Sequence, residues 1–257
     1  MRTELSVLEM RQRMKNKIFA VKTNEKLVDN VFMMTLEGDC SAITAPGQFV
    51  NIALDGLFLR RPISVCDVED NRLTVIYKVV GKGTEQLSEY AAGTKLDLLT
   101  GLGNGYDISC GGNKPLLIGG GVGLPPLYLL AKRLIADGKQ PGVILGFNTK
   151  SEIFLADEFE RIGCKVYITT ADGGAGIKGF VTDAMAQITD FDYSFSCGPE
   201  PRLRAVYEKS ETDGQFSFEE RLGCGFGACM GCSCKTKYGY KRICREGPVL
   251  KRGEIVW

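Results

Sequence analysis

Residues 116–126, LLIGGGVGLPP, lead from an apolar run through a glycine cluster into two prolines. An apolar strand, a glycine turn and a helix start form the βα unit whose backbone can approach a dinucleotide pyrophosphate. The fingerprint of that unit is G-x-G-x-x-G, and Pro126 stands here in place of the third glycine. Proline is tolerated in the first helical turn because its missing N–H would be unpaired there. We therefore predict nucleotide contacts at Gly120, Gly121 and Gly123; a tight βα turn without a ligand is the alternative.

The pattern around this unit predicts the rest of a sheet. Apolar runs at 115–121, 142–147, 165–170 and 193–197 alternate with helix-like segments at 124–138, at 151–162 and after Pro199. Such alternation predicts a parallel, doubly wound α/β domain. The last run ends in Cys197, Gly198 and Pro199, and strand carboxyl ends in such a sheet bind ligands. We predict that these residues complete the nucleotide site, although a Gly-Pro turn can also simply start a helix.

The choice between NAD and NADP stays open from the sequence. A residue that reads the ribose is usually acidic and lies about 20 residues after the glycines. The next apolar run instead ends in GFNTK, residues 146–150, with no acid. Lys150 would suit a 2′-phosphate.

The N-terminal part predicts a different architecture. Residues 17–100 hold short strand-like runs separated by Gly, Asp and Asn, at 17–23, 30–36, 47–54, 61–68 and 72–80. Runs of this length and spacing predict a small antiparallel β barrel or sandwich. A short helix is predicted over residues 83–90.

Two segments of this barrel suggest a second ligand. In Arg61-Pro62-Ile63-Ser64 the guanidinium offers a planar fork for two pyrophosphate oxygens, Pro62 stiffens the backbone and Ser64 can donate a hydrogen bond. An exposed arginine beside a strand is the alternative. The second segment holds Tyr77, Lys78 and Val79, and then Gly83 and Thr84 at a predicted helix start. A helix start is a natural phosphate site, so we predict that both segments line one flavin cleft.

Six of the ten cysteines lie between Cys197 and Cys244. Cys224, Cys229 and Cys232 have the spacing C-x4-C-x2-C, with Cys244 further on, which is the plant-type [2Fe-2S] pattern. Glycines between them permit the tight turns by which three thiolates of one loop reach a cluster. Cys234 in place of Cys232, and a four-cysteine zinc site, are the alternatives. From about residue 215 the chain is rich in Gly and Cys and loses periodicity, which predicts a small cluster domain.

Composition limits the chemistry. The chain has 257 residues, a net charge of +1 and no histidine. The lack of histidine excludes Rieske ligation and histidine-based catalysis, so we assign no catalytic side chain and expect cofactors to react. Near-neutral charge argues against nucleic acid, and no run suits a membrane span.

The N-terminus is too charged for a signal peptide. We expect residues 1–13 to be an extension, because Met14 opens the first strand-like segment. Without an export signal, the cysteines favour a cytoplasmic metal cluster over a disulfide framework.

Together the three sites resemble a known family. The order of barrel, R-P-x-S, G-x-G-x-x-P and C-G-P resembles the ferredoxin–NADP reductase superfamily over about residues 16–215. CGFGACMGC at 224–232, RIC at 242–244 and the tail GPVLKRGEIVW narrow the resemblance to electron-transfer subunits of type B, NAD-dependent dihydroorotate dehydrogenase. One departure is Ile63, where many superfamily members have an aromatic residue.

The resemblance implies FAD at residues 61–64, 77–79 and 83–84, a [2Fe-2S] cluster on Cys224, Cys229, Cys232 and Cys244, and NAD as substrate. It implies a partner: a separate FMN-containing subunit that oxidises dihydroorotate in pyrimidine biosynthesis, two copies of each subunit forming a heterotetramer. This chain is too short to contain that subunit's barrel as well, because such a barrel takes about 250 residues. We expect the predicted cluster domain to face the partner. Electrons would pass from FMN through the cluster and FAD to NAD⁺.

We predict four parts: an extension at 1–13, an FAD-binding barrel at 14–105, an NAD-binding domain at 106–213 and a cluster domain at 214–257. Two rival functions remain. The first is a reductase subunit of a sulfhydrogenase, a ferredoxin:NADP⁺ oxidoreductase or an oxygenase. The second is a zinc-stapled binding module.

Overall fold

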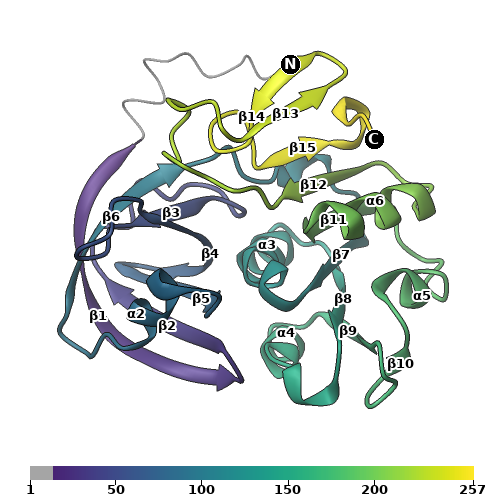
Figure 1. Cartoon of the computed structure of the whole chain (residues 1–257). Helices are drawn as coiled ribbons and strands as arrows, with labels where there is room; N and C mark the ends of the chain where they lie inside the picture. The colour runs from purple at the N-terminus through teal and green to yellow at the C-terminus, as the bar shows by residue number, and fades with distance from the viewer. Residues whose placement is uncertain (1–13) are drawn as a thin grey trace.

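The N-terminal part is a closed antiparallel barrel. The structure is a computed structural model that describes residues 14–257, so the predicted extension at 1–13 lies outside the described residues. The barrel order is β1-β2-β5-β4-β3-β6, and it occupies the left of Figure 1. Its strands are β1 (Lys15–Val28), β2 (Val31–Glu37), β3 (Phe49–Ile52), β4 (Arg61–Glu69), β5 (Arg72–Lys78) and β6 (Lys95–Leu102). Helix α2 (Lys82–Ser88) follows β5, as predicted.

The two faces of β3 serve different cores. Val50 and Ile52 point into the barrel, where they pack with Phe19, Leu73 and other apolar side chains. Phe49 belongs instead to the apolar cluster on the outside of the barrel. Successive side chains of a strand point to opposite faces, so Asn51 shares the outward face with Phe49.

The second part is a doubly wound α/β domain, as the sequence predicts. The sheet order is β10-β9-β8-β7-β11-β12-β15. Its strands before residue 200 are β7 (Pro115–Gly120), β8 (Gly142–Phe147), β9 (Lys165–Thr170), β10 (Ile177–Lys178) and β11 (Tyr193–Gly198). Its helices are α3 (Pro125–Ala136), α4 (Ala156–Arg161), α5 (Val181–Met185) and α6 (Glu200–Lys209), and short 3₁₀ turns lie at Ile108–Cys110, Gly121–Gly123, Lys150–Glu152 and Arg252–Glu254.

The helix predicted over 151–162 is partly wrong. A 3₁₀ turn covers Lys150–Glu152, Ile153 is extended, and α4 begins only at Ala156. Leu155 has φ 63°, in the left-handed region. A helix cannot run through a left-handed residue, so the two pieces stay separate.

The C-terminal part adds two strands to the same sheet. β12 (Gly214–Phe218) pairs parallel to β11, and β15 (Val249–Lys251) pairs antiparallel to β12. Between them lie the cysteine loop and a hairpin of β13 (Ser233–Thr236) and β14 (Gly239–Arg242). The loss of sequence periodicity from about residue 215 therefore does not mark the end of regular structure. The run GQFSF alternates polar and apolar residues as a strand does, but it is only five residues long and was not recognised as a strand.

The parts are tied together at two places. Helix α3 lies between barrel and sheet (Figure 1) and packs on β4, where Lys132 Nζ is 2.7 Å from both Asp67 Oδ2 and Glu69 Oε1. Asn104, after β6, donates through Nδ2 to the carbonyls of Glu246 and Val249. In the described part of the chain, no helix is long and apolar enough to cross a membrane.

Candidate functional site

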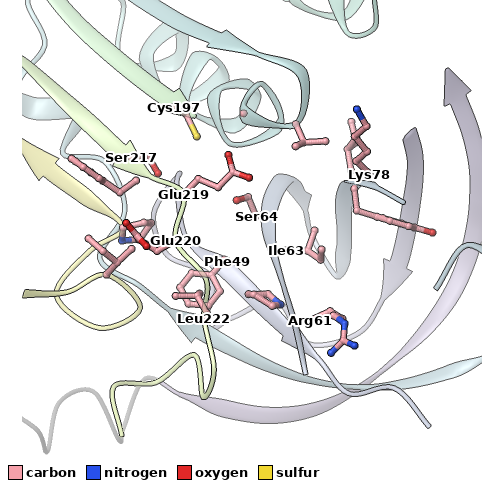
Figure 2. Close-up of a pocket in the computed structure, with 18 of the residues that line it drawn as sticks. Phe49, Arg61, Ile63, Ser64, Lys78, Cys197, Ser217, Glu219, Glu220 and Leu222 are labelled. Atoms are coloured by element: carbon pink, nitrogen blue, oxygen red, sulfur yellow. The ribbon is translucent and has the colours of Figure 1, made fainter. Parts of the chain in front are cut away.

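A cavity of about 330 Å³ lies where barrel, sheet and cysteine segment meet. Figure 2 shows side chains of all three parts pointing into it. Nine of the predicted ligand residues line it: Arg61, Pro62, Ile63, Ser64, Tyr77, Lys78, Thr84, Gly123 and Cys197. The structure therefore brings the predicted flavin segments and part of the nucleotide edge into one space.

Six other predicted residues are not among those that line this cavity: Val79, Gly83, Gly120, Gly121, Gly198 and Pro199. Val79 packs against the barrel core and its N–H donates to Asn30. Gly120 and Gly198 end β7 and β11, Gly121 opens the 3₁₀ turn after β7, and Gly83 lies in the first turn of α2. Their assignment stays a prediction.

One corner of the cavity is lined by Arg61, whose side chain packs against Gly83 at the start of α2. A Cβ at Gly83 would lie 2.1 Å from Arg61 Nε, so the guanidinium rests on the helix start where a side chain is missing. Arg61 Nη1 donates to the Leu59 carbonyl at 2.5 Å. Among residues 14–257, no acceptor lies within hydrogen-bond distance of Nε or Nη2. Their N–H groups form a fork that can donate two hydrogen bonds to phosphate oxygens.

Thr84 and Tyr77 shape the corner rather than offer open hydroxyls. Thr84 Oγ1 accepts hydrogen bonds from the N–H groups of Val80 and Gly81, at 2.9 and 3.3 Å. The Tyr77 hydroxyl donates to Asn24 Oδ1 at 2.8 Å. Burial raises the pKa of Tyr77 to about 12, although the Asn24 hydrogen bond lowers it. These bonds fix the loop that follows β5.

The nucleotide edge depends on close backbone contact. Gly123 lies against the end of β11, and a Cβ there would be 2.8 Å from the Cys197 carbonyl oxygen. Any side chain at Gly123 would force the βα turn away from the strand. Burial raises the pKa of the Cys197 thiol to about 12. The thiol is thus neutral near pH 7, which suits a soft contact and no nucleophilic role.

Sequence reasoning missed three residues that shape this edge. Arg202 Nη1 donates to the Gly120 carbonyl at 3.0 Å, and burial lowers the pKa of its guanidinium. Glu219 and Glu220 follow β12 and line the cavity, and Figure 2 shows Glu219 pointing between Cys197 and Ser64. The sequence pattern did not predict β12, so nothing indicated that these two acids lie at the carboxyl end of a strand.

The four predicted cluster cysteines form two pairs. The sulfurs of Cys232 and Cys244 are 3.3 Å apart and buried. The Cys229 N–H lies 3.4 Å from Cys224 Sγ, so these two cysteines are also neighbours. A [2Fe-2S] cluster takes four cysteine thiolates, two for each iron. The pairing fits that requirement, and Cys234 lies instead on β13, with its thiol toward the Lys235 carbonyl.

The loop around Cys224 favours a thiolate. The N–H groups of Ala228 and Cys229 lie 3.2 and 3.4 Å from Cys224 Sγ. Burial raises the pKa of this thiol, but these donors and the Phe226 N–H together bring it down to about 6. Metal ligands must be deprotonated, so the backbone favours the form of Cys224 that is able to bind a metal.

Gly223 lies close to a second cysteine of the loop. A Cβ there would be 3.3 Å from Cys229 Sγ, which is tighter than most Cβ contacts. Arg242 Nη1 donates to the Gly227 carbonyl at 2.9 Å and braces the loop from β14, a role that the sequence did not indicate. Among the described residues, no group of three or more His, Cys, Asp or Glu side chains that could hold one metal ion is found.

Comparisons with known proteins agree with this geometry. Residues 219–256 match the sequence model of the iron-sulfur cluster binding domain of dihydroorotate dehydrogenase B. The electron transfer subunit of dihydroorotate dehydrogenase B (NAD⁺) from Fusobacterium nucleatum is 40% identical over 250 residues, covering 91% of this chain and 96% of that protein. The subunit of the same name from Geobacillus sp. WCH70 is 40% identical over 256 residues, covering 95% and 99%.

Solved structures share the fold. The structure of an NADH-dependent reduced ferredoxin-NADP oxidoreductase has a TM-score of 0.85 at 31% identity, covering 93% of this chain and 90% of that chain. The FAD/NAD binding domain of a Vibrio cholerae nitric oxide dioxygenase has a TM-score of 0.68 at 18% identity, covering 79% and 98%; it shows the fold alone. With 40% identity over nearly its full length, the chain belongs to the family of electron transfer subunits of NAD⁺-dependent dihydroorotate dehydrogenase B.

Proposed function

We propose that this chain carries electrons from a dihydroorotate-oxidising partner to NAD⁺ in pyrimidine biosynthesis. One observation carries the proposal: a single cavity is lined by the flavin strand (Ser64), the nucleotide turn (Gly123) and both ends of the cysteine segment (Leu222 and Ile243). The partner is an FMN-containing catalytic subunit, and two copies of each form the complex. We place this complex in the cytoplasm. The four-part division predicted above remains part of the proposal.

FAD occupies the cavity beside β4 and β5. Arg61 holds its pyrophosphate, and the backbone of residues 62–64 and 77–79 and the start of α2 at Gly83 and Thr84 hold the rest. When bound, the flavin can exchange two electrons with a nicotinamide and one with a cluster. The chain's own part is to bind and orient: Gly123 keeps the βα turn against β11, so a nicotinamide on this edge faces the same cavity.

Three glycines and the C-G-P turn bind NAD. Gly120, Gly121 and Gly123 present backbone to its pyrophosphate, and Cys197, Gly198 and Pro199 lie at the neighbouring strand end. Arg202 holds the Gly120 carbonyl and so fixes this turn. The [2Fe-2S] cluster is held by Cys224, Cys229, Cys232 and Cys244, and the N–H groups that favour the Cys224 thiolate tune it.

A visible absorption spectrum of the purified protein, taken before and after anaerobic addition of NADH, tests the proposal. We expect flavin bands and a broad iron–sulfur absorption, both of which NADH bleaches. Zinc in place of iron, or no flavin band, would overturn the cofactor assignment. Co-purification with an FMN-containing subunit, and dihydroorotate-dependent reduction of NAD⁺ by the complex, test the partner.

A second candidate is the reductase subunit of a ferredoxin:NADP⁺ oxidoreductase. The TM-score of 0.85 to such a structure favours it, whereas the higher identity and the cluster-domain match favour dihydroorotate dehydrogenase. The two differ in their electron source. If the complex reduces NAD⁺ with dihydroorotate but not with reduced ferredoxin, the result supports the dihydroorotate dehydrogenase function.

A further inference from the structure

Strand β3 separates the flavin strand from the cysteine loop. Along the barrel, β3 pairs antiparallel to β4, with Phe49 opposite Ser64 and Asn51 opposite Pro62. On its outward face the same two residues meet the cysteine segment. The backbone of each residue thus pairs with the strand beside the proposed FAD site, and the side chain of each faces the proposed cluster site.

Asn51 holds the cysteine loop directly. Its side chain is only 1% exposed, and Nδ2 donates to the Cys224 carbonyl at 3.1 Å. The next residue, Gly225, has φ +80°, and a Cβ there would lie 2.5 Å from Asn51 Nδ2. The loop thus reaches the amide only because residue 225 has no side chain.

The amide is retained at a cost. Asn51 Oδ1 is buried and has no hydrogen-bond partner among the described residues. A buried acceptor without a partner is destabilising, and an apolar side chain of similar size would avoid this cost. The bond from Nδ2 to the Cys224 carbonyl is thus the one interaction at this position that an apolar residue could not supply.

Phe49 fills the space beside Asn51. It lines the cavity that we assign to FAD, and it also packs in the apolar cluster that contains Cys232, Ile243 and Cys244. One aromatic ring therefore lies between the flavin cavity and the second cysteine pair. Because electron transfer between two groups weakens steeply with their separation, the residues that set this separation matter for function.

We propose that Asn51 is a positioning residue that fixes the cluster loop at a set distance from the flavin strand, with Phe49 as the spacer beside it. This inference rests on the proposed function, since it concerns the two cofactors named there. Asn51 acts through the Cys224 backbone and touches neither the substrate nor the reacting atoms.

The test compares the FAD- and cluster-loaded wild type with Asn51→Leu. Two quantities are measured anaerobically: the rate of iron release to a chelator, and the rate of cluster bleaching relative to flavin bleaching after mixing with NADH. We expect iron release to rise by up to roughly tenfold, the factor for about 1.4 kcal/mol; the full tenfold corresponds to the loss of one buried hydrogen bond, and removal of the unpaired Oδ1 offsets part of it. Flavin bleaching stays unchanged, while cluster bleaching falls behind it.

Gln48→Met is the matched control. Gln48 is fully buried one residue before β3, and its amide bonds Gly103, Thr44 and Ala45 within the barrel. This variant removes a buried amide from the barrel without touching the cysteine loop, so its iron release stays at the wild-type rate. Asn51→Ser is a second, smaller variant in case Asn51→Leu does not fold; its side chain is too short to reach the Cys224 carbonyl.

The outcomes are distinguishable. If both Asn51 variants keep wild-type iron release and the wild-type ratio of bleaching rates, or if Gln48→Met changes them equally, the inference is wrong and the proposed function stands. A wild type that lacks flavin or iron–sulfur absorption overturns the proposed function itself.

Discussion

A methyl group at Gly83 should weaken FAD binding while leaving the helix intact. Gly83 lies in the first turn of α2, and its backbone has no left-handed φ, so alanine fits the chain there. By helix propensity alone, Gly83→Ala should stabilise the fold by up to about 1 kcal/mol. The added Cβ, however, would lie 2.1 Å from Arg61 Nε and 2.5 Å from Cζ and Nη2.

The size of the effect follows from that overlap. Non-bonded carbon atoms keep about 3.5–4 Å apart, so the guanidinium must move by more than about 1 Å. The N–H groups of Nε and Nη2 would then no longer point to the place where we expect the FAD pyrophosphate. Hydrogen bonds to a charged group contribute about 1.5–3 kcal/mol, so the Kd for FAD should rise roughly 10- to 150-fold.

Gly81→Ala supplies the control. Gly81 precedes α2, its φ is 174°, and nothing lies within 4 Å of a Cβ placed there. FAD affinity of the flavin-stripped proteins is measured by titration calorimetry, and their thermal stability by circular dichroism. Wild-type FAD affinity in a folded Gly83→Ala protein would refute the assignment of Arg61 as the pyrophosphate ligand, as would an equal loss of affinity in Gly81→Ala.

Three further changes have defined outcomes. Serine at Cys224, Cys229, Cys232 or Cys244 should abolish the iron–sulfur absorption, whereas Cys234→Ser should keep it; loss of the cluster in Cys234→Ser would reopen the choice of ligands. A hydrogen bond from Lys132 lowers the pKa of Glu69 from 4.5, so its stabilising effect is complete above pH 4.5 and is lost as pH falls through the lowered pKa. Lys132→Met should reduce this acid dependence in urea unfolding at a series of pH values, and an unchanged pH profile would contradict the role of the ion pair. Asn104→Leu removes side-chain bonds to Glu246 and Val249 and should cost about 2–4 kcal/mol of unfolding free energy; a loss under about 0.5 kcal/mol would show that the tie is unimportant.

The sequence was most informative where a local pattern carries a local conformation. The glycine turn before Pro125 and Pro126 predicted β7 and α3, and both lie where expected. The spacing of Cys224, Cys229 and Cys232 predicted one loop, and the structure forms it. The motif of Arg61 and Ser64 predicted one part of a cleft. The glycine turn and the C-G-P turn separately predicted Gly123 and Cys197, which line the same cavity.

Features that depend on contacts between residues far apart in the chain could not be predicted from the sequence. Nothing in GQFSF indicates that β12 would join the sheet beside β11, because a five-residue buried run suits many environments. Leu155 carries no signal for a left-handed backbone, so the late start of α4 was missed. Asn51 and Arg242 are ordinary residues locally, and only the fold brings them to Cys224 and Gly227.

The cysteine segment leaves the sheet and returns to it at adjacent points. The Phe218 N–H, at the end of β12, donates to the Pro248 carbonyl at 2.9 Å, and β15 follows at once. Folding of the sheet therefore already brings both ends of residues 219–247 together, which lowers the loop-closure entropy that opposes metal binding. The segment is an insertion in a hairpin: replacing it by a short turn between β12 and β15 would keep the sheet continuous, but it would remove the outlet for single electrons and also the part of the cavity wall that Glu219, Glu220, Leu222 and Ile243 form.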